Sequence, residues 1–231
     1  MSKQAERDYA DRVEPTHLYQ KPFAVARILR EFAVALDHLQ HCLPAGAAIL
    51  DLGCGSGWTS IFLAKAGFDV TGLDISDRMI AIARERADQE HAEVAFVVGD
   101  MEELELDRHD FDGVLLFDAL HHCPRFPDVL RRAHRHLRQD GFLLLLEPSL
   151  LHLYSPHARA TTRRYGVTEL GFSRNHLNHH LRGIGFRHLT QCYDSGNSYR
   201  GFAGFVRANL RLWCSYFCCY PQVKQIILAQ K

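Results

Sequence analysis

A glycine-rich turn between a strand and a helix constrains the fold of this chain more than any other sequence feature. The apolar run 47–52 predicts a strand, Gly53–Gly57 follows it with the spacing GxGxG, and 58–66 has the pattern of a helix. Glycine permits a tight turn and lets a ligand come close to the main chain. The free N–H groups at the start of the next helix suit a carboxylate or a phosphate. The turn therefore predicts a ligand site at the carboxyl end of the first strand.

The segments on either side of this turn alternate between apolar runs and amphipathic stretches. Further strands are predicted at 70–73, 94–98, 113–117, 142–146, 186–192 and 203–208. Helices are predicted at 23–41, 78–89, 126–137 and 175–182. Apolar strands joined by helices form a parallel sheet that is covered on both faces. The expected fold class is α/β: a doubly wound, mostly parallel seven-stranded sheet with helices on both faces and an N-terminal helical cap.

The composition disfavours several classes of protein. The 27 Lys and Arg residues balance 27 Asp and Glu residues, so a nucleic-acid partner would need a local basic patch. The 7 cysteines lack paired CxxC motifs, which argues against a disulfide framework or a zinc ribbon. Neither a signal peptide nor an apolar run of membrane-spanning length is visible. We therefore expect a cytoplasmic chain with no nucleic-acid partner and no transmembrane segment.

Four aspartates lie at or beside the carboxyl ends of predicted strands, where ligands of such sheets bind. They are Asp51, Asp74, Asp100 and Asp118. Carboxylates there would repel the pyrophosphate of a dinucleotide, but they would attract a sulfonium cation that carries an ammonium group and a ribose diol. Trp58 also stands where a dinucleotide fingerprint has a small residue. This charge pattern favours S-adenosylmethionine over NAD.

These motifs resemble, in order and spacing, those of the class I S-adenosylmethionine-dependent methyltransferases. Residues 51–57 resemble the first motif of that family, 73–76 the second, 99–101 the third and 117–122 the fourth. The resemblance covers roughly residues 46–148, and it implies S-adenosylmethionine as the cofactor. By this resemblance, the cofactor-binding residues are Asp51, Gly53, Cys54, Gly55, Gly57, Asp74, Ile75, Asp100, Met101, Phe117 and Asp118.

The resemblance also divides the chain into three regions. Residues 1–45 form an N-terminal cap or lid, and 46–210 form the methyltransferase core, in which 149–183 are an insertion on the acceptor side. Residues 211–231 form an apolar tail, for which buried core, a dimer surface and a membrane-surface patch stay open as alternatives. A homodimer is therefore one possibility.

Two adjacent histidines and a glutamate follow the fourth and fifth predicted strands: His121, His122 and Glu147. A hydroxyl or carbon acceptor needs a base to remove its proton, whereas a neutral amine or a thiolate does not. Similar pairs of a histidine and an acid occur in sugar and natural-product O-methyltransferases, which implies His121 as the base and Glu147 as its partner. A mere packing role for one histidine stays open. The expected reaction is methyl transfer to a small-molecule or glycan acceptor at a hydroxyl oxygen. N- or C-methylation and a non-catalytic cofactor-binding protein are the alternatives.

Related enzymes place acceptor contacts in the segment after Glu147, and in many of them a segment like the N-terminal cap folds over the cofactor as a lid. By that likeness the candidates are Tyr19, His152, Tyr154, Arg159, Arg163 and Arg164, although a solvated basic loop explains the arginines equally well. His176, His179 and His180 have helical spacing, but no metal is expected because the cofactor needs none.

A short-chain oxidoreductase is the main rival interpretation. It would need a Tyr-xxx-Lys pair after the fourth or fifth strand, and the only such spacing joins Tyr220 to Lys224 across Pro221. No lysine lies between Lys65 and Lys224, so the sequence lacks the catalytic lysine of that class.

Overall fold

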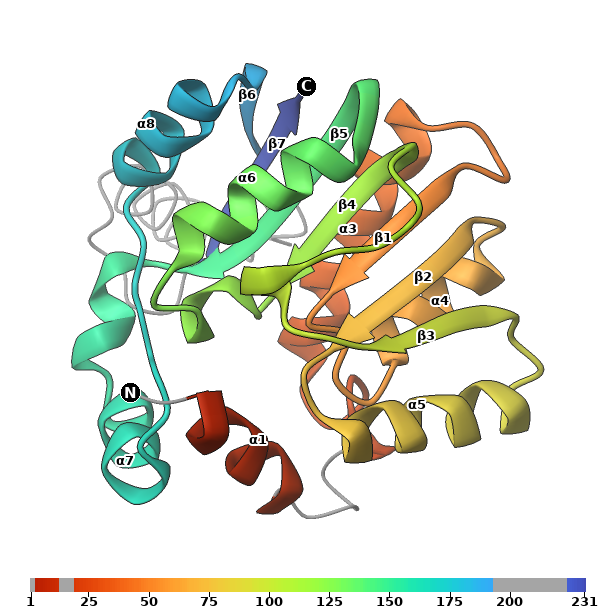
Figure 1. Cartoon of the computed structure of the whole chain (residues 1–231). Coiled ribbons are helices and arrows are strands. Elements are labelled where there is room, and N and C mark those ends of the chain that lie inside the picture. The colour runs from red at the N-terminus through yellow and green to blue at the C-terminus, as the bar shows by residue number, and fades with distance from the viewer. Residues whose placement is uncertain (1–2, 13–18, 193–223) are drawn as a thin grey trace, which may run out of the picture.

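The computed structural model describes residues 3–12, 19–192 and 224–231, and a seven-stranded sheet lies at the centre of these residues (Figure 1). The strands are β1 (Ala48–Leu52), β2 (Asp69–Asp74), β3 (Val94–Val98), β4 (Phe111–Phe117), β5 (Leu137–Pro148), β6 (Arg187–Cys192) and β7 (Lys224–Gln230). Their order in the sheet is β3-β2-β1-β4-β5-β7-β6. The first five strands are parallel, and β7 runs antiparallel to both β5 and β6.

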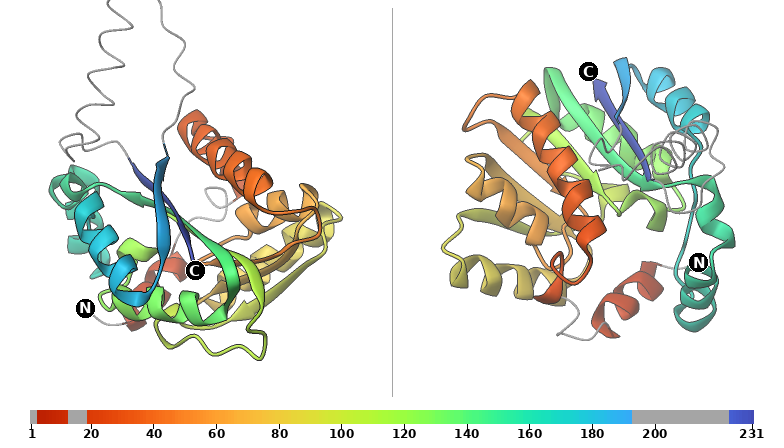
Figure 2. Two further views of the ribbon diagram at one scale, coloured as in Figure 1. Left: turned by 90° about the horizontal axis from the view of Figure 1, so that it is seen from above. Right: turned by 180° about the vertical axis from the view of Figure 1, so that it is seen from behind.

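Helices cover both faces of this sheet (Figures 1 and 2). They are α1 (Lys3–Arg12), α3 (Ala26–Cys42), α4 (Trp58–Lys65), α5 (Asp77–Gln89), α6 (Phe126–His136), α7 (Pro156–Tyr165) and α8 (Arg174–Ile184). Within the described residues there are also three short 3-10 helices: η1 (Met101–Glu103), η2 (Leu120–His122) and η3 (Leu150–Tyr154). Of the helices in the described ranges, none has the length and hydropathy needed to span a bilayer.

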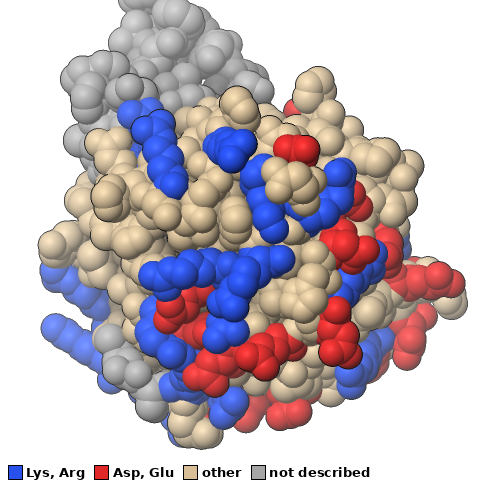
Figure 3. All heavy atoms as spheres, turned by 45° about the horizontal axis from the view of Figure 1, so that its top comes forward, with Lys and Arg blue, Asp and Glu red and all other residues tan. Residues whose placement is uncertain are grey.

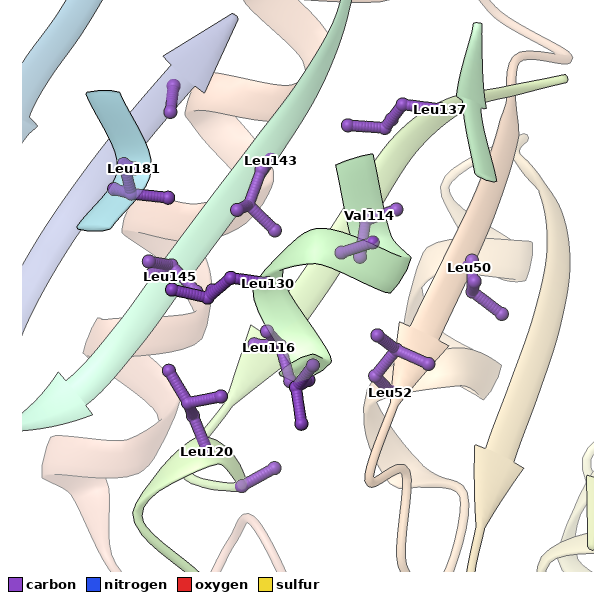
Figure 4. Packing of buried hydrophobic residues seen from close by; sticks show 14 of the residues in the cluster. Leu50, Leu52, Val114, Leu116, Leu120, Leu130, Leu137, Leu143, Leu145 and Leu181 are labelled. Atoms are coloured by element: carbon purple, nitrogen blue, oxygen red, sulfur yellow. The ribbon is translucent and has the colours of Figure 1, made fainter. Parts of the chain in front are cut away.

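The core consists of two apolar layers, one on each face of the sheet, because successive strand residues point to opposite faces. On one face, Leu52, Leu116 and Leu145 pack with Leu130 of α6 and Leu181 of α8 (Figure 4). On the other face, the strands pack against α3 and α4 through a second cluster of buried residues. The central strands read as continuous apolar runs since both of their faces are buried.

Local sequence signals explain where several helices begin. The Ser76 side chain accepts a hydrogen bond from the Met79 N–H, and Ser155 and Ser173 cap α7 and α8 in the same way. Gly57 precedes α4 with a φ of 77°, a backbone conformation that favours glycine. These caps fix the ends of helices that lie beside the carboxyl edge of the sheet.

The predicted α/β fold with seven strands is confirmed, and the sheet is mixed. The strand predicted at 203–208 lies outside the described residues. The antiparallel strand between β5 and β6 is β7, which falls within the range 211–231 that the sequence suggested as a tail. Residues 224–230 therefore belong to the sheet, which agrees with the buried-core alternative for this part of the tail.

The sequence patterns did not predict two of the helices, and they misplaced the start of one strand. The polar helix α1 buries no residue fully, and α7 buries only Ala158 and Thr161, so neither shows a continuous apolar face. The helix predicted at 126–137 ends at His136, and β5 begins at Leu137, earlier than the predicted residue 142. The reason is that Leu137 pairs with Phe111 before the register of β4 and β5 shifts.

Charged side chains of both signs are mixed on the face shown in Figure 3, where basic and acidic groups lie close together. This face therefore offers no extended surface of a single charge.

Candidate active site

A cavity of about 220 Å³ lies at the carboxyl edge of the parallel strands. Eight of the predicted site residues line it: Gly53, Gly55, Asp74, Ile75, Asp100, Met101, Asp118 and His122. Helix α1 closes one side through Lys3, Glu6 and Tyr9. The cavity is therefore assembled from the strand ends of the core and from the N-terminal cap.

The glycine turn forms one wall of the cavity through Gly53 and Gly55, which have no side chains. The N–H groups of Gly53 and Cys54 both donate to the Leu73 carbonyl, at 2.7 and 3.0 Å, which ties the turn to the end of β2. Gly53 has a φ of 77°, and a Cβ atom there would lie 2.5 Å from the Cβ of Ala119. This position therefore accepts only glycine without a shift of the neighbouring backbone.

Asp74 presents its carboxylate to the cavity from the end of β2. It accepts hydrogen bonds from the N–H groups of Gly55 and Ser76, at 2.9 and 3.0 Å. Burial raises the pKa of Asp74, and these N–H donors work against that rise. The backbone thus holds the carboxylate in one orientation, with further lone pairs available to a ligand hydroxyl.

Asp100 lies across the cavity at the start of η1. Its carboxylate accepts from the Glu102 N–H at 2.8 Å and so caps this short helix. Lys3 of α1 also donates to Asp100 and pairs with Glu102 and Glu103. The N-terminal cap is therefore attached to the cavity wall by a cluster of ion pairs.

Asp118 follows β4 and faces a buried lysine. The ammonium of Lys224, at the start of β7, lies 2.5 Å from Asp118 and 2.8 Å from Glu31 of α3. It also lies 4.5 Å from the centroid of the Phe117 ring. Burial disfavours the ionised form of Asp118, but the Lys224 charge outweighs burial and holds the pKa of Asp118 below its usual value.

Glu147 organises the turn that carries both histidines. It is fully buried at the end of β5, and its carboxylate accepts from the N–H groups of Ala119, Leu120 and His121 at 3.0, 2.8 and 3.2 Å. The same carboxylate lies 2.9 Å from Nδ1 of His121. Because a carboxylate only accepts, His121 donates through Nδ1, and Nε2 has a lone pair in the neutral ring.

The two histidines differ in environment. Burial alone would lower the pKa of His121, but the hydrogen bond and charge of Glu147 raise it above its usual value. His122 lines the cavity, and its Nδ1 donates to the Thr168 carbonyl at 3.0 Å. Burial and the neighbouring His121, whose ring centroid is 4.1 Å away, lower the pKa of His122 to about 3. The structure thus places His122 on the cavity wall and His121 directly behind it.

Three further acid–base groups join this cluster from distant parts of the chain. Glu169 lies 2.7 Å from Nε2 of His152 and 3.8 Å from Nε2 of His121. Glu6 of α1 accepts from the Thr168 N–H at 2.8 Å, and burial raises its pKa to about 7. Sequence patterns did not single out Glu6 or Glu169, because both lie in segments without clear hydrophobic periodicity.

Part of this chain is similar in sequence to known methyltransferases. A family model described as a methyltransferase domain matches residues 49–141, the part of the chain that carries the glycine turn and the cavity aspartates. Residues 49–141 therefore form a methyltransferase domain. The 27-O-demethylrifamycin SV methyltransferase of Amycolatopsis mediterranei is 35% identical over 158 residues, which cover 64% of this chain and 58% of that enzyme. A ubiquinone biosynthesis O-methyltransferase of Paramagnetospirillum magneticum is 31% identical over 139 residues, or 59% of this chain and 55% of that enzyme.

Solved methyltransferase structures share the fold. The phosphoethanolamine N-methyltransferase 2 of Haemonchus contortus, in complex with S-adenosylmethionine, has a TM-score of 0.69 at 18% identity and covers 97% of this chain and 59% of its own. A methyltransferase from Mesorhizobium loti has a TM-score of 0.63 at 19% identity, covering 87% of this chain and 100% of its own. This chain spans about half the length of the curated relatives it matches.

The cofactor of this methyltransferase family is S-adenosylmethionine, and the cavity residues fit it. The oriented Asp74 carboxylate suits a ribose diol, and the side-chain-free Gly53 lets a ligand approach the main chain. Asp100 and Asp118 add negative charge for a cationic ligand. The donor set thus agrees with a cationic nucleoside.

Four predicted cofactor residues do not line this cavity. Asp51 is buried and accepts from the hydroxyls of Thr59 and Ser60 at 2.5 and 2.6 Å, so it anchors α4 to β1 instead. Cys54 is buried in a cluster with residues of α4 and α5, and a Cβ on Gly57 would lie 2.7 Å from Ala83 of α5. The ring of Phe117 packs edge-on against Trp58. Each of these four residues supports the turn from behind.

None of the six predicted acceptor residues lines the cavity either. Tyr19 donates to Glu85 at 2.9 Å on the surface, and His152 lies behind the wall against Glu169. The other four, Tyr154, Arg159, Arg163 and Arg164, are exposed on η3 and α7. Their side chains point to solvent because Ala158 and Thr161 take the buried face of α7.

Replacing Lys224 is expected to destabilise the protein strongly. A Lys224→Met variant leaves the buried Glu31 carboxylate and Asp118 without their shared cation, which should lower the free energy of unfolding by about 3 kcal/mol in urea titrations. A Lys224→Met/Glu31→Met double variant should recover part of this loss. Lys65→Met is the matched control, since it removes an exposed ion pair with Glu90. Equal losses in both single variants would show that the buried contacts of Lys224 carry no special weight.

Proposed function

We propose that this protein transfers a methyl group from S-adenosylmethionine to a hydroxyl oxygen of a small-molecule or glycan acceptor. The observation that carries the proposal is the meeting of three cavity carboxylates with His122 and, directly behind it, the His121–Glu147 pair. The names of two relatives support oxygen as the acceptor atom. The ubiquinone biosynthesis enzyme is an O-methyltransferase by name, and the rifamycin enzyme is named for a 27-O-demethyl compound.

Three carboxylates would hold the cofactor, which supplies a methyl group already activated by a sulfonium charge when it is bound. Asp74 would accept from the ribose hydroxyls, and Asp100 would accept from the adenine amino group beside Met101. Asp118 would face the ammonium group. The chain therefore supplies mainly orientation, which is the largest contribution it can make to a displacement at an activated carbon.

The histidines would supply the proton acceptor that a hydroxyl needs. Glu147 fixes the His121 ring through Nδ1, so that Nε2 keeps its lone pair, and it also fixes the turn through three N–H groups. His122 would orient the acceptor from the cavity wall, and His121 would take the proton. General-base catalysis of this kind typically contributes about 10²- to 10⁴-fold in rate.

An acceptor screen tests this function. The protein is incubated with S-adenosylmethionine and a panel of phenols, sugars and other alcohols, and release of S-adenosylhomocysteine is measured together with the product mass. With an accepted substrate, His121→Ala and His122→Ala should each lower turnover about 100-fold or more. The exposed His179→Ala on α8 is the control and should match the wild type. Wild-type turnover in both site variants would contradict the assigned base system.

A further inference from the structure

We propose that His121, His122 and Glu169 form a binding site for one divalent transition-metal ion beside the cavity. One ring nitrogen of each histidine and a carboxylate oxygen of Glu169 lie within 4.8 Å of one another. Donors of a single ion lie about 2.0–2.2 Å from it, so small side-chain shifts would bring these three atoms into one coordination sphere. His121 and Glu169 are buried, and His122 is half-buried at the cavity wall.

The hydrogen bonds of both imidazoles are those of metal ligands. A ligating histidine usually donates its second ring N–H to a carboxylate or to a backbone carbonyl, which fixes the ring and the tautomer. Here Nδ1 of His121 donates to Glu147 at 2.9 Å, and Nδ1 of His122 donates to the Thr168 carbonyl at 3.0 Å. Each ring therefore has Nε2 left for an ion. His152 donates to Glu169 at 2.7 Å and holds the carboxylate in turn.

The local charge also favours a cation. Glu169 lies 3.8 Å from Nε2 of His121, and Glu6 lies 3.7 Å from His122. Glu147 adds a third carboxylate on the far side of His121. Carboxylates removed from water are costly unless a positive charge offsets them, and a divalent ion would do so within this cluster.

The donor atoms of this site indicate which metal ions it would bind and which kind of methyl acceptor could reach the ion. Two imidazole nitrogens with one carboxylate suit Fe²⁺, Mn²⁺ or Zn²⁺ and leave coordination positions open, whereas Mg²⁺ and Ca²⁺ prefer oxygen donors. His122 and Thr168 line the cavity, so open positions next to them would be reached from it. An acceptor with two adjacent oxygens, such as a vicinal diol, could bind there in a bidentate manner. A bound ion would lower the pKa of the coordinated hydroxyl.

With an ion bound, His121 would act through it rather than take the proton itself. The role of this ion in catalysis therefore rests on the proposed function. Binding of the ion itself can be measured without turnover. The matched control is the His176–His180 pair on α8, whose ring centroids lie 4.8 Å apart. Such a pair at i and i+4 is the most obvious competing metal site on the described surface.

The test uses the full chain, stripped with a chelator and titrated with Co²⁺ and with Zn²⁺, by visible absorption and by calorimetry. We expect about one ion per chain, with binding weakened about 100-fold or more in Glu169→Gln and in His122→Ala. The His176→Ala/His180→Ala variant should bind as the wild type does. Melting curves establish that each variant is folded, and His122→Ala serves if Glu169→Gln does not fold.

Two results would overturn the site: no ion retained by the wild type, or binding lost only in the α8 variant. Titration of the stripped protein with S-adenosylhomocysteine separates this inference from the proposed function. If S-adenosylhomocysteine binds and no ion does, only the metal site is wrong. If S-adenosylhomocysteine does not bind, the methyltransferase function fails with it.

Discussion

A Gly53→Ala variant is expected to lose about 100-fold or more in affinity for S-adenosylmethionine, which corresponds to about 2.8 kcal/mol. The added Cβ would lie 2.5 Å from the Cβ of Ala119 and 3.0 Å from Cε of Met101. Ala119 follows Asp118 and begins the turn that carries His122, so any shift that relieves the contact moves two walls of the cavity. Calorimetric titration of wild type and variant measures the loss directly.

Gly46→Ala is the control that separates this contact from backbone strain. Gly46 has nearly the same φ, 78°, but a Cβ there would meet nothing within 4 Å. We expect Gly46→Ala to lower stability by about 1 kcal/mol, the cost of a left-handed alanine, and to bind the cofactor normally. Normal cofactor binding by Gly53→Ala would mean that the ligand does not rest on the glycine turn.

The second large effect is expected at Glu147. A Glu147→Gln variant should lower turnover about 100- to 1,000-fold, because the His121 ring loses the carboxylate that fixes it. It should also lower the free energy of unfolding by about 2–4 kcal/mol, since an amide nitrogen would face buried N–H donors. Initial rates and urea titrations measure the two effects separately.

Two variants sharpen this comparison. His121→Ala keeps the main-chain contacts of Glu147, so it should share the loss of turnover and only part of the loss of stability. Lys65→Met, which removes an exposed lysine paired with Glu90, should change neither quantity. If Glu147→Gln unfolds more easily but turns over at the wild-type rate, Glu147 is a structural cap and not part of the base system.

The cofactor half of the site could be predicted because its information is local. A glycine turn follows a strand, and each aspartate follows the strand end that positions it. The position of these residues along the chain therefore predicts that they meet at the carboxyl edge of the sheet. Asp74, Asp100 and Asp118 accordingly line the cavity. Asp51 is the exception, because its buried carboxylate is taken by the hydroxyls of Thr59 and Ser60 in the following helix.

The acceptor half could not be predicted in the same way. Glu6, Thr168 and Glu169 meet beside His122 only through the packing of segments that are far apart in sequence. Lys224 reaches Asp118 because β7 inserts antiparallel between β5 and β6, a placement that no local pattern encodes. The arginines of α7 were predicted as acceptor contacts because they cluster in sequence, but they are exposed and do not line the cavity.

The most direct measurement is a calorimetric titration of the full chain with S-adenosylmethionine, S-adenosylhomocysteine and NAD. We expect the first two to bind to one site per chain with dissociation constants of about 1–100 μM, and NAD to produce no binding heat. Binding of NAD without binding of S-adenosylmethionine would contradict the assignment of this cavity to a methyltransferase cofactor.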